Sequence, residues 1–547
     1  MTRKPTLLSA DASLFGLRRT ALFLIFLASG SLAQAAERRP NILFFFADDW
    51  GRYASIYADA DEPSLNDVIA TPNIDRIGRE GVVFENAFVP VASCGPCRAS
   101  LATGRYFWNC GSRAFLNGKA SSWQGYENPM HSLPKFGDLI RESGYYAQKS
   151  RKTFDFDSSP RPKGLDALGQ VGYERYGLYV GAAKSEAERK SRHDEIVENC
   201  RQEIRQVLAG RTETQPFFFV FGSINIHRPY TPDSGKDLWG IEPDSLKGLL
   251  PKFLPDAHDV RRDFSDYLGE VLALDLMLGA MIEELETAGE LDNTVVILSG
   301  DHGIPGIPRG KTNCYDLATR VPLLVRWPKG IPAGRRVEDF VSVMDVGPTL
   351  LEVAGAEVPA SMDGRSFFPQ LSSQKSGWID PERDSVIIGR ELHFHNSRPG
   401  NVPYPMRAIR TKDYLYIRNF KPERWPMGDP YDAAKLAEPE ALYKMGLRTT
   451  PAYRDLDGSL TKAWMMSRRE EPGDKELFLL TMHPRPDEEL YDLKKDPDQL
   501  VNLADDPELA TVLKSLRGQV DQVMNTTGDP RLKDAFDQLP WVDPTKP

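Results

Sequence analysis

The sequence has few cysteines and no excess of basic charge, and both shortages exclude classes of protein. Its 547 residues include only five cysteines, Cys94, Cys97, Cys110, Cys200 and Cys314. A small, odd number of cysteines excludes a secreted scaffold built on disulfides. The formal net charge of −10 argues against general binding to nucleic acid or anionic membranes, which attract basic patches. We therefore expect no nucleic-acid partner.

Long hydrophobic runs are also lacking. The apolar run Ala21–Ala28 near the N-terminus is much shorter than the ~20 residues of a transmembrane helix. Arg18 and Arg19 precede this run, and Ala33-Gln34-Ala35 has the form of a cleavage site. We expect residues 1–35 to be a signal peptide, with an N-terminal membrane tether as the alternative. The mature protein is then exported, to the periplasm, the medium or a lysosome, without a membrane span.

Short apolar runs alternate with helical patterns over the first two thirds of the chain. The runs of strand length are Asn41–Ala47, Pro216–Phe221, Thr294–Ser299 and Pro322–Trp327. Continuous apolar runs of this kind are typical of strands buried on both faces of a parallel sheet. A helical pattern extends from about Arg262 to Leu285. The alternation predicts an α/β fold, with ligands gathered beyond the C-terminal ends of the strands.

The sequence changes character after about residue 370. The later strand-like and helical segments are short: Asp384–Gly389, Tyr414–Arg418, Glu489–Leu493 and a helix near Pro507–Met524. Tyr431–Asp474 is mostly polar, and we expect it to be an irregular surface loop or a wrap around the main domain. We predict a catalytic domain over residues 38–370 and a smaller α+β domain with an antiparallel sheet over residues 371–547.

The segment that begins at Ser93 carries the strongest chemical signal. Cys94-Gly95-Pro96-Cys97 has the form of a thioredoxin-like redox motif, in which a low thiol pKa drives disulfide exchange. However, the chain is much larger than a thioredoxin domain, and Arg98 and Thr103-Gly104-Arg105 follow the motif. A structural cysteine pair is a second interpretation. The third is Cys-x-Pro-x-Arg followed by Leu-x-Thr-Gly-Arg, which closely resembles the type I sulfatases.

This resemblance implies a modified nucleophile. In the type I sulfatases the first cysteine of the motif, here Cys94, is oxidised to formylglycine by a separate formylglycine-generating enzyme. Hydration of the aldehyde gives two hydroxyls on one carbon, so one attacks sulfur and the other then expels sulfate. The sequence departs from the family at Cys97, where most members have serine.

Acidic residues follow two of the predicted strands. Asp48 and Asp49 come directly after the first strand, and Asp301 and His302 follow a later one. An Asp pair after a strand is by itself more often a helix cap or a turn. Two carboxylate sites at strand ends, however, can converge on one hard cation. Both segments resemble the family's metal ligands, which implies a divalent cation, calcium or else magnesium, at Asp48, Asp49, Cys94, Asp301 and His302.

The resemblance also assigns the remaining catalytic residues. Lys311 lies in a Gly-Lys…Arg-Val-Pro-Leu stretch, which implies a sulfate-binding lysine and proton donor. His227 ends an apolar strand and is the candidate general acid. Lys152 matches the lysine of a Gly-Lys-x-x-x-His element, but Asp155 stands where the histidine is expected. The expected catalytic residues are Cys94, Arg98, Lys152, His227 and Lys311.

Within the family the chain resembles the heparan N-sulfatases most. Gly303-Ile304-Pro305 and Tyr404-Pro405-Met406-Arg407 look like that branch, and His393 and His395 could line its substrate pocket. Arg320 instead belongs to the commoner sulfatase pattern. The resemblance implies an alkaline-phosphatase-like α/β/α sandwich with a smaller C-terminal α+β domain.

The implied function is hydrolysis of a sulfate ester or N-sulfate of a sulfated saccharide, with N-sulfoglucosamine as one candidate. Three alternatives stay open. They are a phosphatase or phosphodiesterase of the same superfamily, a thiol–disulfide protein that uses Cys94 and Cys97, and an inactive sugar-binding module.

Overall fold

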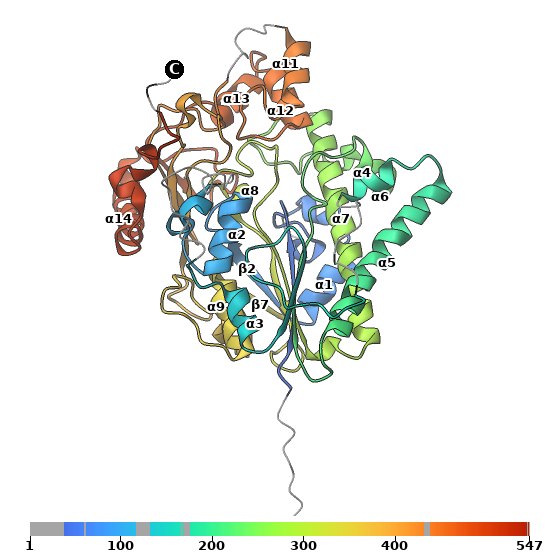
Figure 1. Ribbon diagram of the computed structural model, residues 1–547. Helices are drawn as coiled ribbons and strands as arrows, with labels where there is room; N and C mark the ends of the chain where they lie inside the picture. Colours follow the sequence, from blue (N-terminus) through green and yellow to red (C-terminus); the bar gives the residue numbers. More distant parts are fainter. Residues whose placement is uncertain are drawn as a thin grey trace, which may run out of the picture. The chain divides into compact units, whose positions relative to one another are not determined.

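The computed structural model describes residues 38–59, 62–115, 132–165, 168, 175–430, 438–543 and 545. The expected signal peptide, residues 1–35, lies outside this part of the chain. Arg39–Pro547 form one compact unit built around a seven-stranded and a four-stranded sheet (Figure 1). Among the described helices, none has both the length and the apolar character needed to cross a bilayer.

The larger sheet has the strand order β3-β4-β1-β5-β6-β2-β7. Its strands are β1 (Asn41–Ala47), β2 (Val82–Phe88), β3 (Tyr146–Arg151), β4 (Phe217–Gly222), β5 (Thr294–Gly300), β6 (Leu323–Arg326) and β7 (Arg335–Ser342). The central strand β1 pairs in parallel with β4 and β5, and every residue of these three strands is buried. The apolar runs therefore predicted the middle of the sheet correctly.

One strand direction was predicted wrongly. β6 lies within the run Pro322–Trp327, but it pairs antiparallel with both β5 and β2. The connection from β5 contains only the four-residue helix α8 (Asp316–Thr319). The 22 residues between Gly300 and Leu323 would be enough for a parallel crossover, but they contain no long helix to cover a face of the sheet, and the chain returns in the opposite direction.

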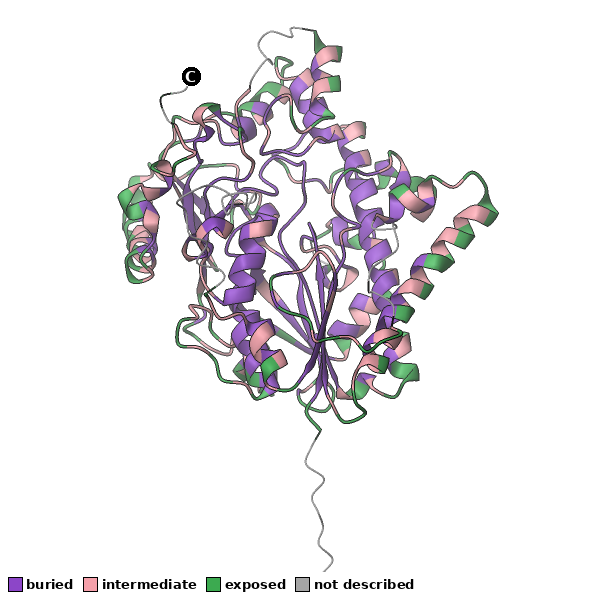
Figure 2. Ribbon diagram, in the orientation of Figure 1, coloured by how far each residue is buried: buried purple, intermediate pink, exposed green. Residues whose placement is uncertain are grey.

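Helices cover both faces of the larger sheet (Figures 1 and 2). One face packs on α1 (Pro72–Arg79), α5 (Glu186–Gly210) and α7 (His258–Thr287), and the other on α2 (Cys94–Thr103), α3 (Phe136–Glu142) and α9 (Val346–Ala354). Alternate residues of β1 point into these two cores, Leu43 into the first and Phe44 into the second. The α/β/α arrangement is therefore the one that the sequence predicted.

The predicted central helix is α7, which begins a few residues before Arg262. It ends at Thr287, and Gly289 follows with a left-handed φ of 70°, as expected of a glycine just past a helix end. The remaining helices are α4 (Tyr176–Gly181), α6 (Ser234–Trp239), α10 (Phe368–Ser372), α11 (Pro439–Gly446), α12 (Leu460–Ser467), α13 (Asp474–Met482) and α14 (Ala510–Thr526).

The smaller sheet is antiparallel, with the order β11-β10-β9-β8. Its strands are β8 (Ser385–Arg390), β9 (Met406–Thr411), β10 (Tyr414–Asn419) and β11 (Glu488–Asp492). Helix α14 packs against β9 and β10. Three of these strands, β8, β10 and β11, and the last helix were therefore predicted to within a few residues, whereas β9 was not predicted.

For the described part of Tyr431–Asp474, the expectation of irregular structure was wrong, whereas the packing on α7 agrees with the alternative of a wrap around the main domain. Helices α11 and α12 pack on each other, and α12 also packs on α7. Lys462, on α12, is fully buried, because backbone carbonyls surround its ammonium group. The polar composition of this segment therefore gave no indication of these two packed helices.

Candidate active site

Two neighbouring strands bring the predicted acidic residues together. In the parallel register of β1 and β5, Ala47 lies opposite Gly300, so Asp48 and Asp301 leave the sheet side by side. The backbone N–H of Asp49 donates a 2.9 Å hydrogen bond to Oδ1 of Asp301. All three aspartates are fully buried. The site thus lies at the carboxyl edge of the sheet, where ligands of α/β proteins bind.

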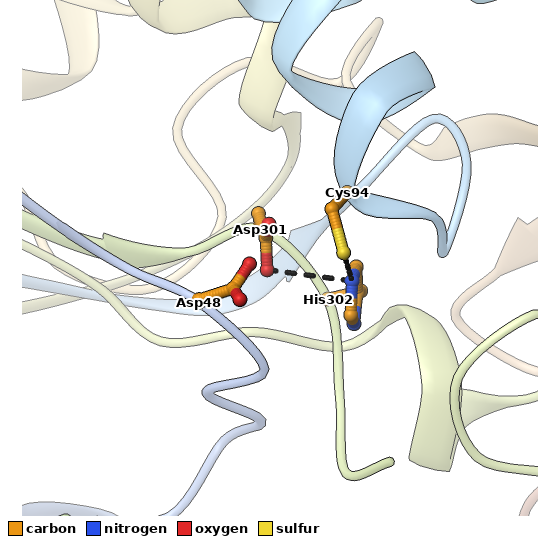
Figure 3. A group of neighbouring side chains, drawn as sticks. All are labelled: Asp48, Cys94, Asp301 and His302. Atoms are coloured by element: carbon orange, nitrogen blue, oxygen red, sulfur yellow. Dashed lines mark hydrogen bonds and ion pairs between the residues drawn. The ribbon is translucent and has the colours of Figure 1, made fainter. Parts of the chain in front are cut away.

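Cys94 begins helix α2 and points toward these acids. Its Sγ lies 3.1 Å from Nε2 of His302. Figure 3 shows the side chains of Asp48, Cys94, Asp301 and His302 converging from three chain segments. Their ligand atoms all lie within 4.8 Å of one another. The predicted nucleophile and the predicted metal ligands therefore form one cluster.

Arg98, one helical turn after Cys94, holds this cluster together. Its Nε donates to Asp301 at 3.0 Å and its Nη2 to Asp48 at 3.1 Å. Its Nη1 donates to the backbone carbonyl of Lys152 at 2.7 Å. Burial opposes the charge of Arg98, but Asp301 and Asp48 outweigh it and raise its pKa. The guanidinium is therefore a fixed cation that joins both acidic strand ends.

Two lysines face the aspartates. Lys152 Nζ donates to Asp48 at 2.6 Å, and Lys311 Nζ lies 3.0 Å from Oδ1 of Asp49. Burial lowers the pKa of each lysine, but Asp48 raises that of Lys152 and Asp49 that of Lys311, so both values end above the ordinary one. Both side chains are thus cations available to an anion.

The two predicted histidines lie at different depths. His302 is fully buried, with Nδ1 3.3 Å from Asp49. Burial lowers its pKa, but Asp301, Cys94 and Asp49 raise it to about 10. The His227 side chain is 28% exposed, and its Nε2 lies 4.0 Å from Asp49. His227 Nδ1 lies 2.7 Å from a backbone carbonyl, which only accepts, so Nδ1 carries the proton and Nε2 faces the site.

The donor atoms fit a hard divalent cation. Three carboxylates are buried together, and Oδ1 of Asp49 accepts no hydrogen bond from any described residue, although it forms ion pairs with Lys311 and His302. Burial raises the pKa of Asp48, but Lys152 and Arg98 hold it well below the ordinary value, so this acid is ionised. Oxygen-rich sets of this kind suit calcium or magnesium.

Some residues named from the sequence lie elsewhere. Asp155, which replaces the family's histidine, is half exposed and pairs with Arg113 at 3.4 Å. Arg320 donates to the backbone carbonyl of Glu85 at 2.8 Å. His395 Nδ1 lies 3.0 Å from the side-chain amide of Asn401. Within the described residues, none of these three contacts the acidic cluster.

Two residues near the nucleophile come from after residue 370. His393 Nδ1 lies 2.8 Å from Oγ of Ser93, the residue before Cys94. Asp457 Oδ2 lies 3.5 Å from Nζ of Lys311. His393 was predicted from the sequence, but Asp457, which lies in the segment expected to be irregular, was not. The pair of acids at positions 455 and 457 was the only local signal.

The family model described as "Sulfatase" matches residues 40–356, more than half of the chain. The chain belongs to the sulfatase family, whose members are sulfuric ester hydrolases. A second model, described as "N-sulphoglucosamine sulphohydrolase, C-terminal", matches residues 309–462. This confirms the resemblance drawn from the Cys94 motif and favours a sulfatase over the phosphatase and thiol–disulfide alternatives.

Individual relatives agree with the family model. The N-sulphoglucosamine sulphohydrolase of Homo sapiens is 26% identical over 517 residues, which cover 89% of this chain and 90% of that protein. An ulvan-active sulfatase of Formosa agariphila is 24% identical over 519 residues, covering 88% and 74%. A solved structure of a protein with its substrate D-glucosamine-2-N,6-O-disulfate has a TM-score of 0.54 at 20% identity, covering 92% and 100%. This structural likeness confirms the expected alkaline-phosphatase-like fold.

Proposed function

We propose that this sulfatase releases sulfate from a sulfated carbohydrate, with formylglycine made from Cys94 as its nucleophile. The observation that carries the proposal is the convergence of Cys94 with buried carboxylates from two distant strand ends. A reactive group beside an acidic cation site, with lysines facing it, fits the hydrolysis of an anionic ester. The formylglycine-generating enzyme is the partner required for maturation.

We further propose that calcium occupies the acidic site. Asp48, Asp49, Asp301 and His302 would hold it, because oxygen ligands predominate among them. When bound, the cation polarises a sulfate oxygen and favours the ionised form of the attacking hydroxyl. Arg98 holds the carboxylates of Asp48 and Asp301 in position by donating a hydrogen bond to each.

The proposed proton and charge roles follow from the contacts. Lys152 and Lys311 are cations at the rim of the acidic cluster and would bind the sulfate oxygens. His227, with its Nε2 toward the site, would protonate the leaving sugar atom as the bond from sulfur to oxygen or nitrogen breaks. Because Asp155 pairs with Arg113, we assign it no proton transfer.

The proposed substrate is a sugar with an N-sulfate, such as N-sulfoglucosamine at a chain end. Support comes from the C-terminal family model and from the named activity of the human relative. A net charge of −10 fits the capture of one chain end better than a grip along a polyanion. We also propose export through residues 1–35, and division of the rest into domains at residues 38–370 and 371–547.

The test is sulfate release by protein produced together with a formylglycine-generating enzyme. Mass spectrometry of the peptide around Cys94 first measures the aldehyde content. N-sulfo, 6-O-sulfo and aryl sulfate substrates are then compared, with Cys94→Ala as the control. We expect release to scale with aldehyde content and to be fastest for the N-sulfo sugar. No release from any substrate by aldehyde-bearing protein would contradict the proposal.

A further inference from the structure

Asp457 presents a buried carboxylate to the ammonium group of Lys311. Lys311 Nζ lies 3.0 Å from Asp49 and 3.5 Å from Asp457. No described residue donates a hydrogen bond to the Asp457 carboxylate. Burial raises its pKa, but Lys311 and His393 outweigh burial and lower it to about 2, so the group is ionised at neutral pH. An ionised acceptor with free lone pairs thus adjoins the proposed sulfate-binding lysine.

Lys462 stabilises the loop that carries Asp457 through hydrogen bonds to its backbone carbonyls. The fully buried ammonium of Lys462 donates to the carbonyls of Ala452 at 2.7 Å and Leu456 at 2.9 Å. It also donates to the carbonyl of Arg448 at 3.1 Å. The terminal nitrogen of Lys462 thus binds backbone carbonyls between residues 448 and 456, and this fixes the loop internally.

The loop is also fixed to the rest of the site. Asp455 accepts hydrogen bonds from Arg390 and Arg398, both at 2.7 Å. On the other side of Asp457, the hydroxyl of Ser459 donates to the carbonyl of Gly306 at 2.7 Å. Gly306 belongs to the segment that connects the metal acids to Lys311. The position of Asp457 relative to Lys311 is therefore set before any ligand binds, which favours selective recognition.

From these contacts we infer that Asp457 determines which sulfated sugar the pocket accepts. Its carboxylate takes a hydrogen bond from a hydroxyl or amino group beside the sulfated position, and it rejects a sugar with a second sulfate there. A carboxylate accepts from donors but repels another anion at close range. The inference rests on the proposed function and refines it. For an N-sulfated glucosamine, the neighbouring donor is the 3-hydroxyl.

The experiment measures binding, so it does not depend on turnover. Protein with unmodified Cys94 and added calcium is titrated calorimetrically with 2-N-sulfoglucosamine and with 2-N,3-O-disulfoglucosamine. The variant is Asp457→Asn, which keeps the shape and removes the charge. The control is Glu440→Gln, because Glu440 is an exposed acid on α11 that forms an ion pair with Lys444. Both variants lose one negative charge from the same part of the chain.

Wild-type protein is expected to bind the monosulfated sugar more tightly than the disulfated one. In Asp457→Asn the monosulfated sugar should bind ~10- to 100-fold more weakly, the range for losing a hydrogen bond to a charged group. The disulfated sugar should bind as tightly as before or more tightly, so the preference shrinks or reverses. Glu440→Gln should keep the wild-type preference.

Equal losses for both sugars in Asp457→Asn would overturn the inference, because they would show that Asp457 acts only by positioning Lys311. An unchanged preference would overturn it too. Asp457→Ser, compared by the same ratio and by its melting temperature, separates a folding defect from lost selectivity. Absent sulfate release with an intact Asp457-dependent preference would contradict the proposed function alone.

Discussion

Cys94 Sγ lies 3.1 Å from Nε2 of His302, although the two residues are 208 positions apart in the chain. The contact joins the first turn of α2 to the loop after β5. Because three buried carboxylates surround it, we expect ligands that bind these groups to affect the stability of the whole fold.

Removal of the divalent cation should lower thermal stability. A chelator is expected to lower the melting temperature, and calcium in excess should restore it. At a free calcium concentration 100 times the dissociation constant, binding adds ~2.7 kcal/mol to the free energy of unfolding. Scanning calorimetry with and without calcium measures the shift. Asp48→Asn should abolish most of it, whereas an unchanged wild-type melting temperature would refute the cation site.

Cys97 should be inert in the folded protein. It is fully buried, and burial raises the pKa of its thiol well above the ordinary value, with Asp301 adding to the effect. Because the thiolate is the reactive form, iodoacetamide should leave Cys97 unmodified until the protein is unfolded. Peptide mass spectrometry before and after denaturation checks this. Fast labelling of native protein would instead revive a thiol–disulfide function.

Gly222→Ala should damage the site from a distance. A Cβ at Gly222 would lie 1.8 Å from the backbone oxygen of Lys152, the atom that accepts a hydrogen bond from Arg98. The strand pair must shift, at a cost of ~1–3 kcal/mol in the free energy of unfolding. Denaturant titration measures the loss, and sulfate release should fall with it.

The matched control is Gly518→Ala on the exposed side of α14, where a Cβ has no heavy atom within 4 Å. An alanine in a helix interior is ~0.8–1 kcal/mol better than glycine, so this variant should be more stable than wild type. Equal effects of the two substitutions would contradict the close approach at Gly222.

Glu270→Gln should change the pH dependence of stability. Burial raises the pKa of Glu270 to about 8, while Gly177 and Asn225 only partly oppose this by donating hydrogen bonds. A raised carboxyl pKa means that the folded state holds the proton more tightly than the unfolded state. Its contribution is fully present below the ordinary carboxyl range and is lost as pH rises through about 8.

The glutamine variant cannot ionise, so it should lose less stability than wild type between pH 5 and pH 9. At pH 5 it is expected to be the less stable protein, because only its amide oxygen accepts, so it cannot accept from both Gly177 and Asn225 as the two carboxyl oxygens do. Melting temperatures at several pH values check this. Parallel curves for the two proteins would contradict it.

The parts of the fold that could be predicted from the sequence are those in which burial requires a regular pattern of apolar residues along the chain. β1 was predicted to the residue, because both faces of a central parallel strand are covered and all its side chains after Asn41 are apolar. The direction of β6 was not predictable in the same way. Its apolar run looks the same in either direction, and the 22 residues that connect it to β5 are long enough for a parallel or an antiparallel strand.

The candidate site likewise contains residues that could be predicted from the sequence and residues that could not. Asp48, Asp49 and Asp301 were recognisable because each follows a predicted strand, and strand ends meet at one edge of a sheet. Asp457 carries no such mark. Its place depends on the carbonyls around Lys462 and on the packing of α12 on α7, contacts between segments that no local pattern records.

The reach of the site along the chain, from Asp48 to Asp457, has a practical consequence. A shortened polypeptide that stops near residue 370 would retain Asp48, Asp49 and Asp301 of the cation cluster. It would lose the Asp457 carboxylate beside Lys311. Such a fragment, if it folded, would discriminate poorly among sugars rather than simply run more slowly. Substrate selectivity would therefore report whether the C-terminal third is intact, which a bare rate measurement would miss.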